Sequence, residues 1–303
     1  DWLNQRNDIF DTNIPIFDKE EKPYFNLITL GVGSNRDVWV YNYSKGNLKS
    51  NIETFINAYS NHLQIAGTTK ENVGSKIDLD PTKISWSRGL RNSLIRNTNI
   101  EFSEDCLRTV LYRPFTKQNN YFDKHLNEYL YQQPKLYPDK KTKNLNINIS
   151  GVGASKEFSV LISDCIVDMQ TLSNEQCLPL YYFEERKKNS PSLFDATGES
   201  EYIRRDGVSD FILERAKKVY GKNVGKEDIF YYVYGILHSP DYRTAFANDL
   251  KKMLPRIPLV EDVRDFWKFS KEGRALAELH INYEDVPPYD GVEISGDSTG
   301  FFR

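Results

Sequence analysis

The sequence between residues 111 and 122 reads Leu111-Tyr112-Arg113-Pro114-Phe115-Thr116-Lys117-Gln118-Asn119-Asn120-Tyr121-Phe122. This stretch places cations, side-chain amides and aromatic rings around one proline, and it supplies none of the groups of a catalytic centre. Arg and Lys can contact phosphates or guanine edges, Asn and Gln can pair bidentately with adenine, and aromatic rings can stack on bases. The stretch therefore fits a surface that contacts nucleic acid. The alternative interpretation is a strand that ends at the proline and buries its rings in the core.

The composition indicates an ordinary globular protein. The chain has 303 residues, of which 39% are hydrophobic, enough for one large domain or two smaller ones. No run approaches the roughly 18 apolar residues of a membrane span, and the start, Asp1-Trp2-Leu3-Asn4, does not resemble a secretory signal. The start also lacks an initiator Met, so we expect a segment of a longer polypeptide. Three scattered cysteines, Cys106, Cys165 and Cys177, predict a reduced cytoplasmic setting, and no His or Cys pair has zinc-site spacing.

Charge is distributed unevenly along the chain. The net charge of −3 argues against a uniformly basic nucleic-acid coat. Between Lys83 and Lys143, however, 12 Lys and Arg residues stand against 6 Asp and Glu, whereas between Glu261 and Asp297 there are 4 basic residues and 10 acidic. The first segment predicts a positive surface toward DNA, and the second predicts an acidic end that faces solvent or a basic partner.

Hydrophobic periodicity predicts a mixed α and β region up to residue 183. We expect strands at 24–30, 38–41, 146–149, 158–162, 165–168 and 178–183. Helices are predicted at 46–65, 87–96 and 103–110, the last with Ser103 as a plausible N-cap.

The composition changes after residue 183. Charged residues, Ser, Pro and Gly replace periodic apolar residues over 184–206, which predicts a linker. Helices are then expected at 209–220, 226–238, 241–254, 261–269 and 271–282. The predicted fold class is therefore α+β, with a mixed α/β domain at 1–183, a linker at 184–206 and a helical C-terminal domain at 207–303.

Four short motifs have competing interpretations. Two Gly-Val-Gly triplets, Gly31–Gly33 and Gly151–Gly153, lack the third glycine of a dinucleotide-binding pattern, so tight turns are preferred over cofactor loops. The segment Val286-Pro287-Pro288-Tyr289 resembles the Asn-Pro-Pro-Tyr motif of adenine amino-methyltransferases, but valine cannot orient an amino group, and we expect a loop. The turn Asn35-Arg36-Asp37 predicts either a local ion pair or a DNA contact. No nucleophile elbow, phosphate-binding loop or nuclease carboxylate cluster is recognisable, so an autonomous enzyme is not expected.

Three segments together resemble the C-terminal specificity region of Type ISP restriction-modification enzymes. The first two are Gly33-Ser34-Asn35-Arg36-Asp37-Val38-Trp39-Val40-Tyr41-Asn42 and Tyr112-Arg113-Pro114-Phe115, which also recur in related adenine methyltransferases. The third is Asp228-Ile229-Phe230-Tyr231-Tyr232-Val233-Tyr234-Gly235-Ile236-Leu237-His238-Ser239-Pro240-Asp241-Tyr242-Arg243, continued by Leu254-Pro255-Arg256-Ile257-Pro258. This third run is long and unusual, so its match is the specific one.

The resemblance implies a place in a larger enzyme. In that family one polypeptide joins a nuclease, a helicase-like translocase, a coupling region, an adenine-N6 methyltransferase and a target recognition domain. The chain resembles the last part, with residues 1–45 as a candidate trailing edge of the methyltransferase. The implied partners are double-stranded DNA and the methyltransferase and helicase/nuclease domains of the same polypeptide. No cofactor is expected in this segment, whereas S-adenosylmethionine, ATP and Mg are implied for the full-length enzyme.

The predicted function is sequence-specific recognition of double-stranded DNA as the specificity module of such an enzyme. One alternative is a structural coupling module that docks the methyltransferase to the helicase motor, which the acidic C-terminal half and the Tyr-rich helices favour. Another is an enzyme that holds S-adenosylmethionine at a Gly-Val-Gly turn.

The family implies no individual base-reading residues, so the candidate DNA contacts follow from residue chemistry alone. They are Arg36, Arg88, Arg91, Arg113, Lys117, Asn119 and Asn120. Within the stretch at 111–122, the half from Tyr112 to Phe115 is expected to act as scaffold or phosphate grip. The half from Lys117 to Asn120 is the better candidate for contacts with the bases. No catalytic or metal-binding residue is predicted.

Overall fold

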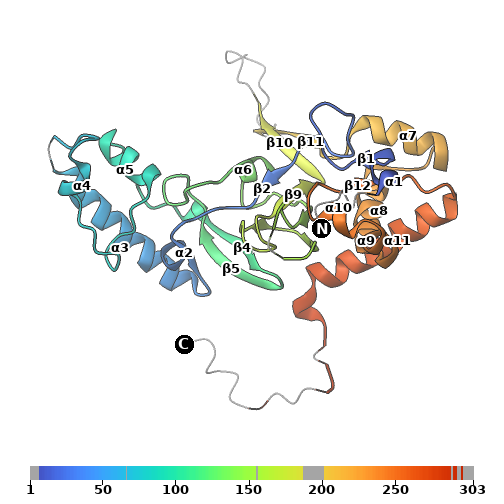
Figure 1. Cartoon of the computed structure of the whole chain (residues 1–303). Coiled ribbons are helices and arrows are strands. Elements are labelled where there is room, and N and C mark those ends of the chain that lie inside the picture. The colour runs from blue at the N-terminus through green and yellow to red at the C-terminus, as the bar shows by residue number, and fades with distance from the viewer. Residues whose placement is uncertain are drawn as a thin grey trace, which may run out of the picture. The chain divides into compact units, whose positions relative to one another are not determined.

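The computed structural model of the chain describes residues 7–65, 67–154, 156–186, 201–287, 289–291 and 295 (Figure 1). The fold class is α+β, as predicted. Contacts between residues divide the chain into two compact units that alternate along the sequence. Unit 1 comprises residues 1–32, 111–116 and 130–281, and unit 2 comprises residues 33–110, 117–129 and 282–303.

Unit 1 contains a four-stranded antiparallel sheet. Its order is β2 (Thr29–Leu30), β9 (Gln176–Pro179), β6 (Asn146–Ile149) and β7 (Val160–Ser163). Every residue of β6 and β7 is buried, so both faces of these strands are covered. In β6 the isoleucines alternate with Asn146 and Asn148, whose amides donate to the Tyr137 hydroxyl and the Ser163 hydroxyl at 2.7 and 2.8 Å. These hydrogen bonds lower the cost of burying two amides in a sheet.

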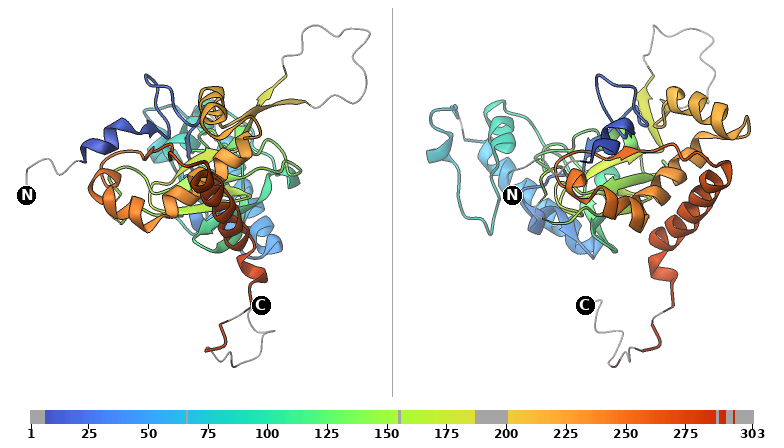
Figure 2. Two further views of the ribbon diagram at one scale, coloured as in Figure 1. Left: turned by 90° about the vertical axis from the view of Figure 1, so that its right-hand side faces the viewer. Right: turned by 45° about the vertical axis from the view of Figure 1, so that its right-hand side comes forward.

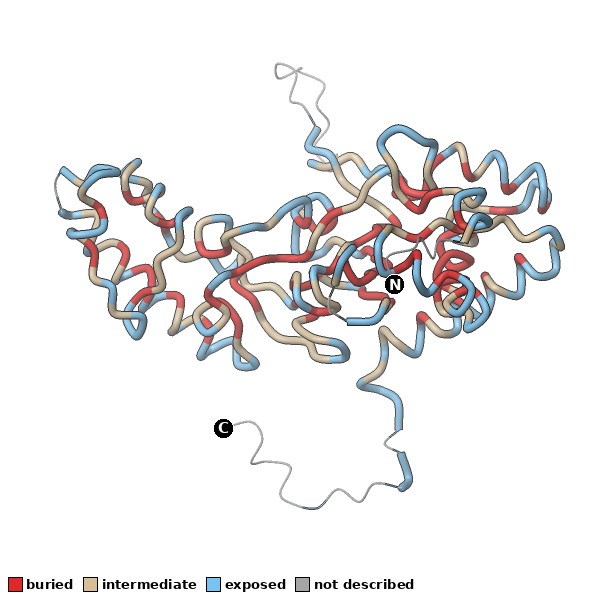
Figure 3. The backbone as a smooth tube through the Cα atoms, in the orientation of Figure 1, coloured by how far each residue is buried: buried red, intermediate tan, exposed pale blue. Residues whose placement is uncertain are grey.

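Helices complete the core of unit 1. α7 (Asp210–Tyr220), α8 (Lys226–His238) and α11 (Val263–Ile281) lie together in both views of Figure 2. α8 is buried along most of its length (Figure 3), and its aromatic residues share one hydrophobic core with the isoleucines of β6. The helices after residue 207 and the strands before residue 183 therefore fold around the same core.

Two glycines allow α8 and α11 to approach closely. A Cβ on Gly273 of α11 would lie 2.1 Å from the Tyr231 carbonyl oxygen of α8, and a Cβ on Gly235 of α8 would lie 2.4 Å from the Phe269 carbonyl oxygen of α11. Any side chain at either position would push the helix axes apart.

The other elements of unit 1 are short. They are α1 (Asp8–Thr12), β1 (Ile14–Pro15) paired with β12 (Arg256–Ile257), α6 (Gln133–Leu136), β8 (Ile166–Val167), β10 (Tyr181–Glu185) paired with β11 (Tyr202–Asp206), α9 (Pro240–Ala245) and α10 (Ala247–Leu250). The pairing of β10 with β11 shows that both ends of the segment predicted as a linker contain strand. Residues 187–200 of that segment lie outside the described residues.

Unit 2 is built around one long helix. The helix α3 (Lys45–Leu63) was predicted from its apolar spacing, and it buries Leu48, Ile52, Phe55, Ile56 and Tyr59. The unit also contains α2 (Asp37–Val40), β3 (Tyr41–Asn42), α4 (Val73–Lys76), α5 (Arg88–Ile95), the 3₁₀ turns η1 (Glu104–Cys106) and η2 (Tyr283–Asp285), and most of β4 (Leu107–Arg113) and β5 (Thr116–Tyr121). β5 pairs antiparallel with β3.

Several secondary-structure predictions need correction. Residues 37–40 form a helical turn rather than a strand, because the Ser34 hydroxyl accepts from the Arg36 N–H at 3.1 Å and the turn closes onto the Arg36 carbonyl. Of the helix predicted at 103–110, only the single turn η1 is helical, and pairing within the sheet takes the rest into β4. The two helices predicted after 261 are one helix, α11, and that predicted at 241–254 is interrupted at Phe246.

The Gly-Val-Gly triplets are positions of close backbone packing. A Cβ on Gly31 would lie 2.7 Å from the Asp168 carbonyl carbon, and a Cβ on Gly151 would lie 2.3 Å from the Asn174 carbonyl oxygen. Gly153 has a φ of +74°, which a glycine adopts without strain. These contacts explain the first glycine of both triplets by packing alone.

Candidate nucleic-acid interface

The short helix α5 and its C-cap carry three arginines, Arg88, Arg91 and Arg96, at or near the surface of unit 2. The Ser87 hydroxyl caps the helix by accepting from the Leu90 N–H at 3.2 Å, as its residue type favours. Leu90 and Leu94 are buried, and α5 packs against α3. Arg88 is exposed and Arg91 is half-buried, with an Nε that is buried and has no hydrogen-bond partner among the described residues. Arg88 is thus placed as a surface cation, and Arg91 lies at the edge of the buried face.

Arg36 lies inside unit 2. Its side chain is fully buried, and Nη1 donates to the backbone carbonyls of Leu126 and His125 at 2.7 and 3.3 Å. Nη2 lies 3.9 Å from Oε2 of Glu128, and the guanidinium stacks over the Phe55 ring of α3. Burial lowers the pKa of Arg36 to about 10, an effect that Glu128 partly opposes. Direct DNA contact by Arg36 is therefore not supported by its position.

The two predicted asparagines of β5 also make internal contacts. Asn120 is fully buried, and its Nδ2 donates to the Val40 carbonyl at 3.2 Å and to Oδ1 of Asn127 at 3.4 Å. Asn119 is half-buried and donates to the carbonyls of Asn42 and Tyr43 at 3.1 and 2.8 Å. Contrary to the prediction, the buried Asn120 exposes no surface to a duplex in this position. Asn119 holds the turn at Asn42 and Tyr43, and Tyr43 is 70% exposed.

The remaining two predicted residues belong to different units. In unit 2, Nζ of Lys117 lies 5.7 Å from the centroid of the Tyr283 ring, and the residue is half-buried. In unit 1, Arg113 stacks on the neighbouring Tyr112 ring at 3.8 Å, and its Nη1 donates to Oδ1 of the buried Asp168 at 2.8 Å. This ion pair agrees with a scaffold role for Tyr112–Phe115, since the Arg113 charge is already matched by a carboxylate.

Sequence reasoning missed the residues that organise α5. The nearly buried Glu128 accepts from the Gly89 N–H of α5 at 3.2 Å, and Ser93 of α5 lies 3.3 Å from Nδ1 of His125. A Cβ on Gly89 would lie 3.0 Å from Glu128 Oε2, so glycine suits this contact. No local motif reveals Glu128, because its partners lie far away in the sequence. The exposed Asn92 could have been found by extending the helical spacing from Arg88.

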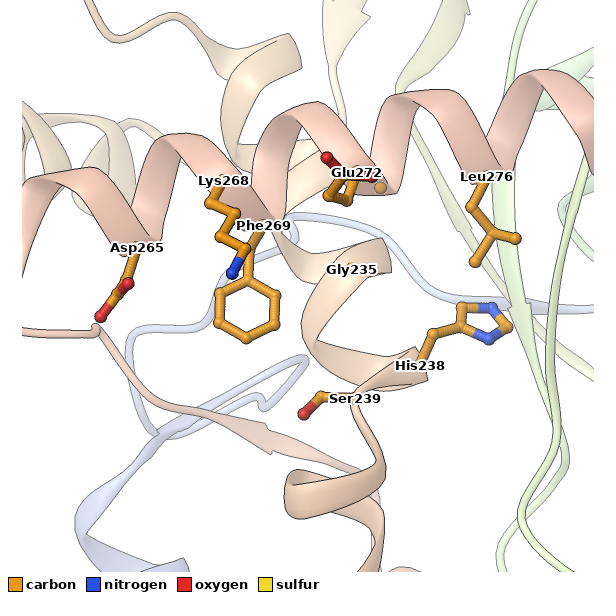
Figure 4. A pocket seen from close by; sticks show the side chains of 9 residues that line it. Gly235, His238, Ser239, Asp265, Lys268, Phe269, Glu272 and Leu276 are labelled. Carbon is orange, nitrogen blue, oxygen red and sulfur yellow. The ribbon is translucent and has the colours of Figure 1, made fainter.

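A pocket of about 400 Å³ lies in unit 1 between α8 and α11 (Figure 4). Its charged lining residues are Asp265, Lys268 and Glu272, so carboxylates outnumber the cation. Phe269, Leu276 and His238 add an apolar and aromatic wall. This lining is poorly suited to the phosphate backbone of DNA.

Within the described part of the chain, no three His, Cys, Asp or Glu side chains are grouped so that they could hold a metal ion. Among the same residues no helix combines the length and the apolar character that crossing a membrane requires.

Comparison with solved structures defines the class of protein. The chain superposes with a TM-score of 0.80 and 35% identity on a nuclease-deletion mutant of the Type ISP restriction-modification enzyme LlaGI, solved with a DNA substrate mimic. The match covers 97% of this chain and 21% of LlaGI. DrdV in a complex with DNA superposes with a TM-score of 0.81 and 29% identity, and the match covers 95% of this chain and 27% of DrdV. The ATP-dependent Type ISP enzyme LlaBIII bound to DNA gives a TM-score of 0.79 and 30% identity, with 96% of this chain and 18% of LlaBIII covered. The fold is thus that of a part of restriction-modification enzymes, and the chain spans about a fifth to a quarter of their length.

The family follows from the sequence match. Residues 23–300 match the model of the Type ISP C-terminal specificity domain, and the chain belongs to this family. The resemblance seen in the sequence is thereby confirmed. No match to a curated protein sequence was found.

Proposed function

We propose that the chain recognises a specific sequence of double-stranded DNA, as the specificity module of a single-polypeptide restriction-modification enzyme. The observation that carries this proposal is the match over 97% of the chain to LlaGI, an enzyme solved with a DNA substrate mimic. The exposed Arg88 and Arg96 at the two ends of α5 support it, since cations that neutralise phosphates supply much of the affinity for DNA.

The chemistry would reside in other parts of the polypeptide. An adenine-N6 methyltransferase, a translocase and a nuclease would act there, with S-adenosylmethionine, ATP and Mg bound by those parts. The module would then direct either methylation of one adenine in the site or, at an unmodified site, translocation and cleavage. A cytoplasmic location belongs to the same proposal.

The coupling module is the weaker alternative. The tyrosines of α8 that favoured it, Tyr231, Tyr232 and Tyr234, are buried in the core of unit 1. They are explained by packing, and they do not form a docking surface.

Selection from a pool of duplexes with a randomised central segment tests the proposal. We expect the 303-residue chain to enrich one sequence, which then competes better than a scrambled duplex at every salt concentration. The affinity for both duplexes should fall linearly with salt on logarithmic axes, because phosphate contacts release counterions. Equal binding of both duplexes at every salt concentration would contradict the proposal and favour a coupling module.

A further inference from the structure

The outward face of α5 carries a stripe of residues that can read bases. Arg88, Asn92 and the C-cap residue Arg96 are exposed and lie four residues apart, and the Arg96 N–H still donates to the Asn92 carbonyl, so the three follow one another along the same face of the helix. Among the described residues none of the three side chains has a hydrogen bond or an ion pair within the protein. Leu90 and Leu94 turn the opposite face into the core. We call this outward face the α5 stripe.

The helix that carries the α5 stripe is held rigidly. Glu128 binds its first turn through the Gly89 N–H, and His125 contacts Ser93 in its second turn. Both belong to the segment whose carbonyls the buried Arg36 binds. A helix fixed at both turns needs no further backbone ordering on binding, which favours specific recognition.

The residue types in the stripe match the chemistry of the major groove. Arg can pair bidentately with guanine, and Asn can pair bidentately with adenine. A phosphate clamp needs only cations, so the uncharged amide of Asn92 between two arginines points to base edges. A helix of eight residues is about 12 Å long, about the width of the major groove and the length of three to four base pairs.

We propose that the α5 stripe enters the major groove and that Arg88, Asn92 and Arg96 read three to four adjacent base pairs, with Asn92 at an adenine. This inference rests on the proposed function. It assigns Arg91 no base contact, because its half-buried side chain lies beside the stripe. Arg36 and Glu128 are then positioning residues that act through the orientation of α5.

The test compares duplex selection by the original chain with selection by Asn92→Ala, Arg88→Ala and Arg96→Ala. Arg264→Ala is the matched control, because it removes one charge from a side chain in unit 1 that is 86% exposed and far along the sequence. Asn92→Ala should relax one adenine position, with about 5- to 150-fold loss of discrimination there. Its salt dependence should be unchanged, since no charge is removed. Each arginine variant should relax one guanine position, and the control should leave every position as it was.

Three outcomes of the selection distinguish the proposed function from the inference about the α5 stripe. If the original chain enriches no sequence, the proposed function fails, and the inference about α5 fails with it. If the original chain enriches a sequence and all three variants keep the same preferences, the α5 stripe is not a reader, but the proposed function stands. If the arginine variants weaken binding equally for all sequences, Arg88 and Arg96 contact phosphates, and the proposal that all three residues read bases is overturned.

Discussion

Arg36 and Glu128 meet inside unit 2, where Nη2 of the arginine lies 3.9 Å from Oε2 of the glutamate. The arginine also binds two backbone carbonyls of the segment that contains Glu128, and the glutamate binds the first turn of α5. A turn predicted as a DNA contact is therefore the internal support of the helix that we place on DNA.

Replacement of Arg36 should destabilise the protein strongly. Arg36→Ala would leave Glu128 nearly buried without its cation and two carbonyls without a donor, at an expected cost of about 3–5 kcal/mol in the free energy of unfolding. Denaturant unfolding measures this value. Arg264→Ala is the control, because its ion pair with Asp262 is exposed and should contribute at most about 1 kcal/mol. A loss below 1 kcal/mol for Arg36→Ala would contradict the internal role assigned to this residue.

Replacement of Asn120 tests whether this residue supports the fold or contacts DNA. Asn120→Ala removes a buried donor from the Val40 carbonyl and from Asn127, which should cost about 1–3 kcal/mol of stability. DNA affinity, measured well below the unfolding transition, should stay unchanged. Gln118→Ala on the same strand serves as the control, since Gln118 is only half-buried. Weaker DNA binding with unaltered stability would instead restore Asn120 as a contact.

The sequence predicts the elements whose pattern is local. α8 has the predicted bounds of 226–238, and Ser87 caps α5 as its residue type indicates. The apolar run at 38–41 is too short for its period to distinguish strand from helix, and that prediction was wrong. Burial depends on distant partners, so the inward position of Arg36 could not be inferred from its neighbours. The α5 stripe at Arg88, Asn92 and Arg96 could have been predicted from the sequence, because helical spacing places Leu90 and Leu94 on the opposite face.

Two glycine-to-alanine substitutions should have different effects on stability, because only one of the two glycines lies at the close crossing of α8 and α11. Gly273→Ala would place a Cβ 2.1 Å from the Tyr231 carbonyl oxygen, and the forced separation of the helices should cost about 1–3 kcal/mol. Gly74→Ala in α4 meets nothing within 4 Å and should be neutral or stabilise by up to about 1 kcal/mol, because alanine favours helix. Thermal unfolding of both variants gives the comparison. An equal shift in both would show that the helix crossing does not require glycine.

His238, the last residue of α8, makes stability depend on pH. Burial, together with the smaller effects of the nearby His280 and Arg243, lowers its pKa from 6.5 to about 4. Between these two pH values the unfolded chain binds a proton that the folded chain does not. The contribution of His238 to the free energy of unfolding must therefore fall as pH drops from about 6.5 to about 4. The loss of unfolding free energy attributable to His238 is at most about 3 kcal/mol, and the partial exposure of His238 makes this loss smaller.

The difference in unfolding free energy between the original chain and His238→Gln isolates this contribution, since carboxylates titrate alike in both. As pH falls through this range, we expect the original chain to lose stability relative to the His238→Gln variant. A difference that does not depend on pH would show that His238 titrates normally in the folded state.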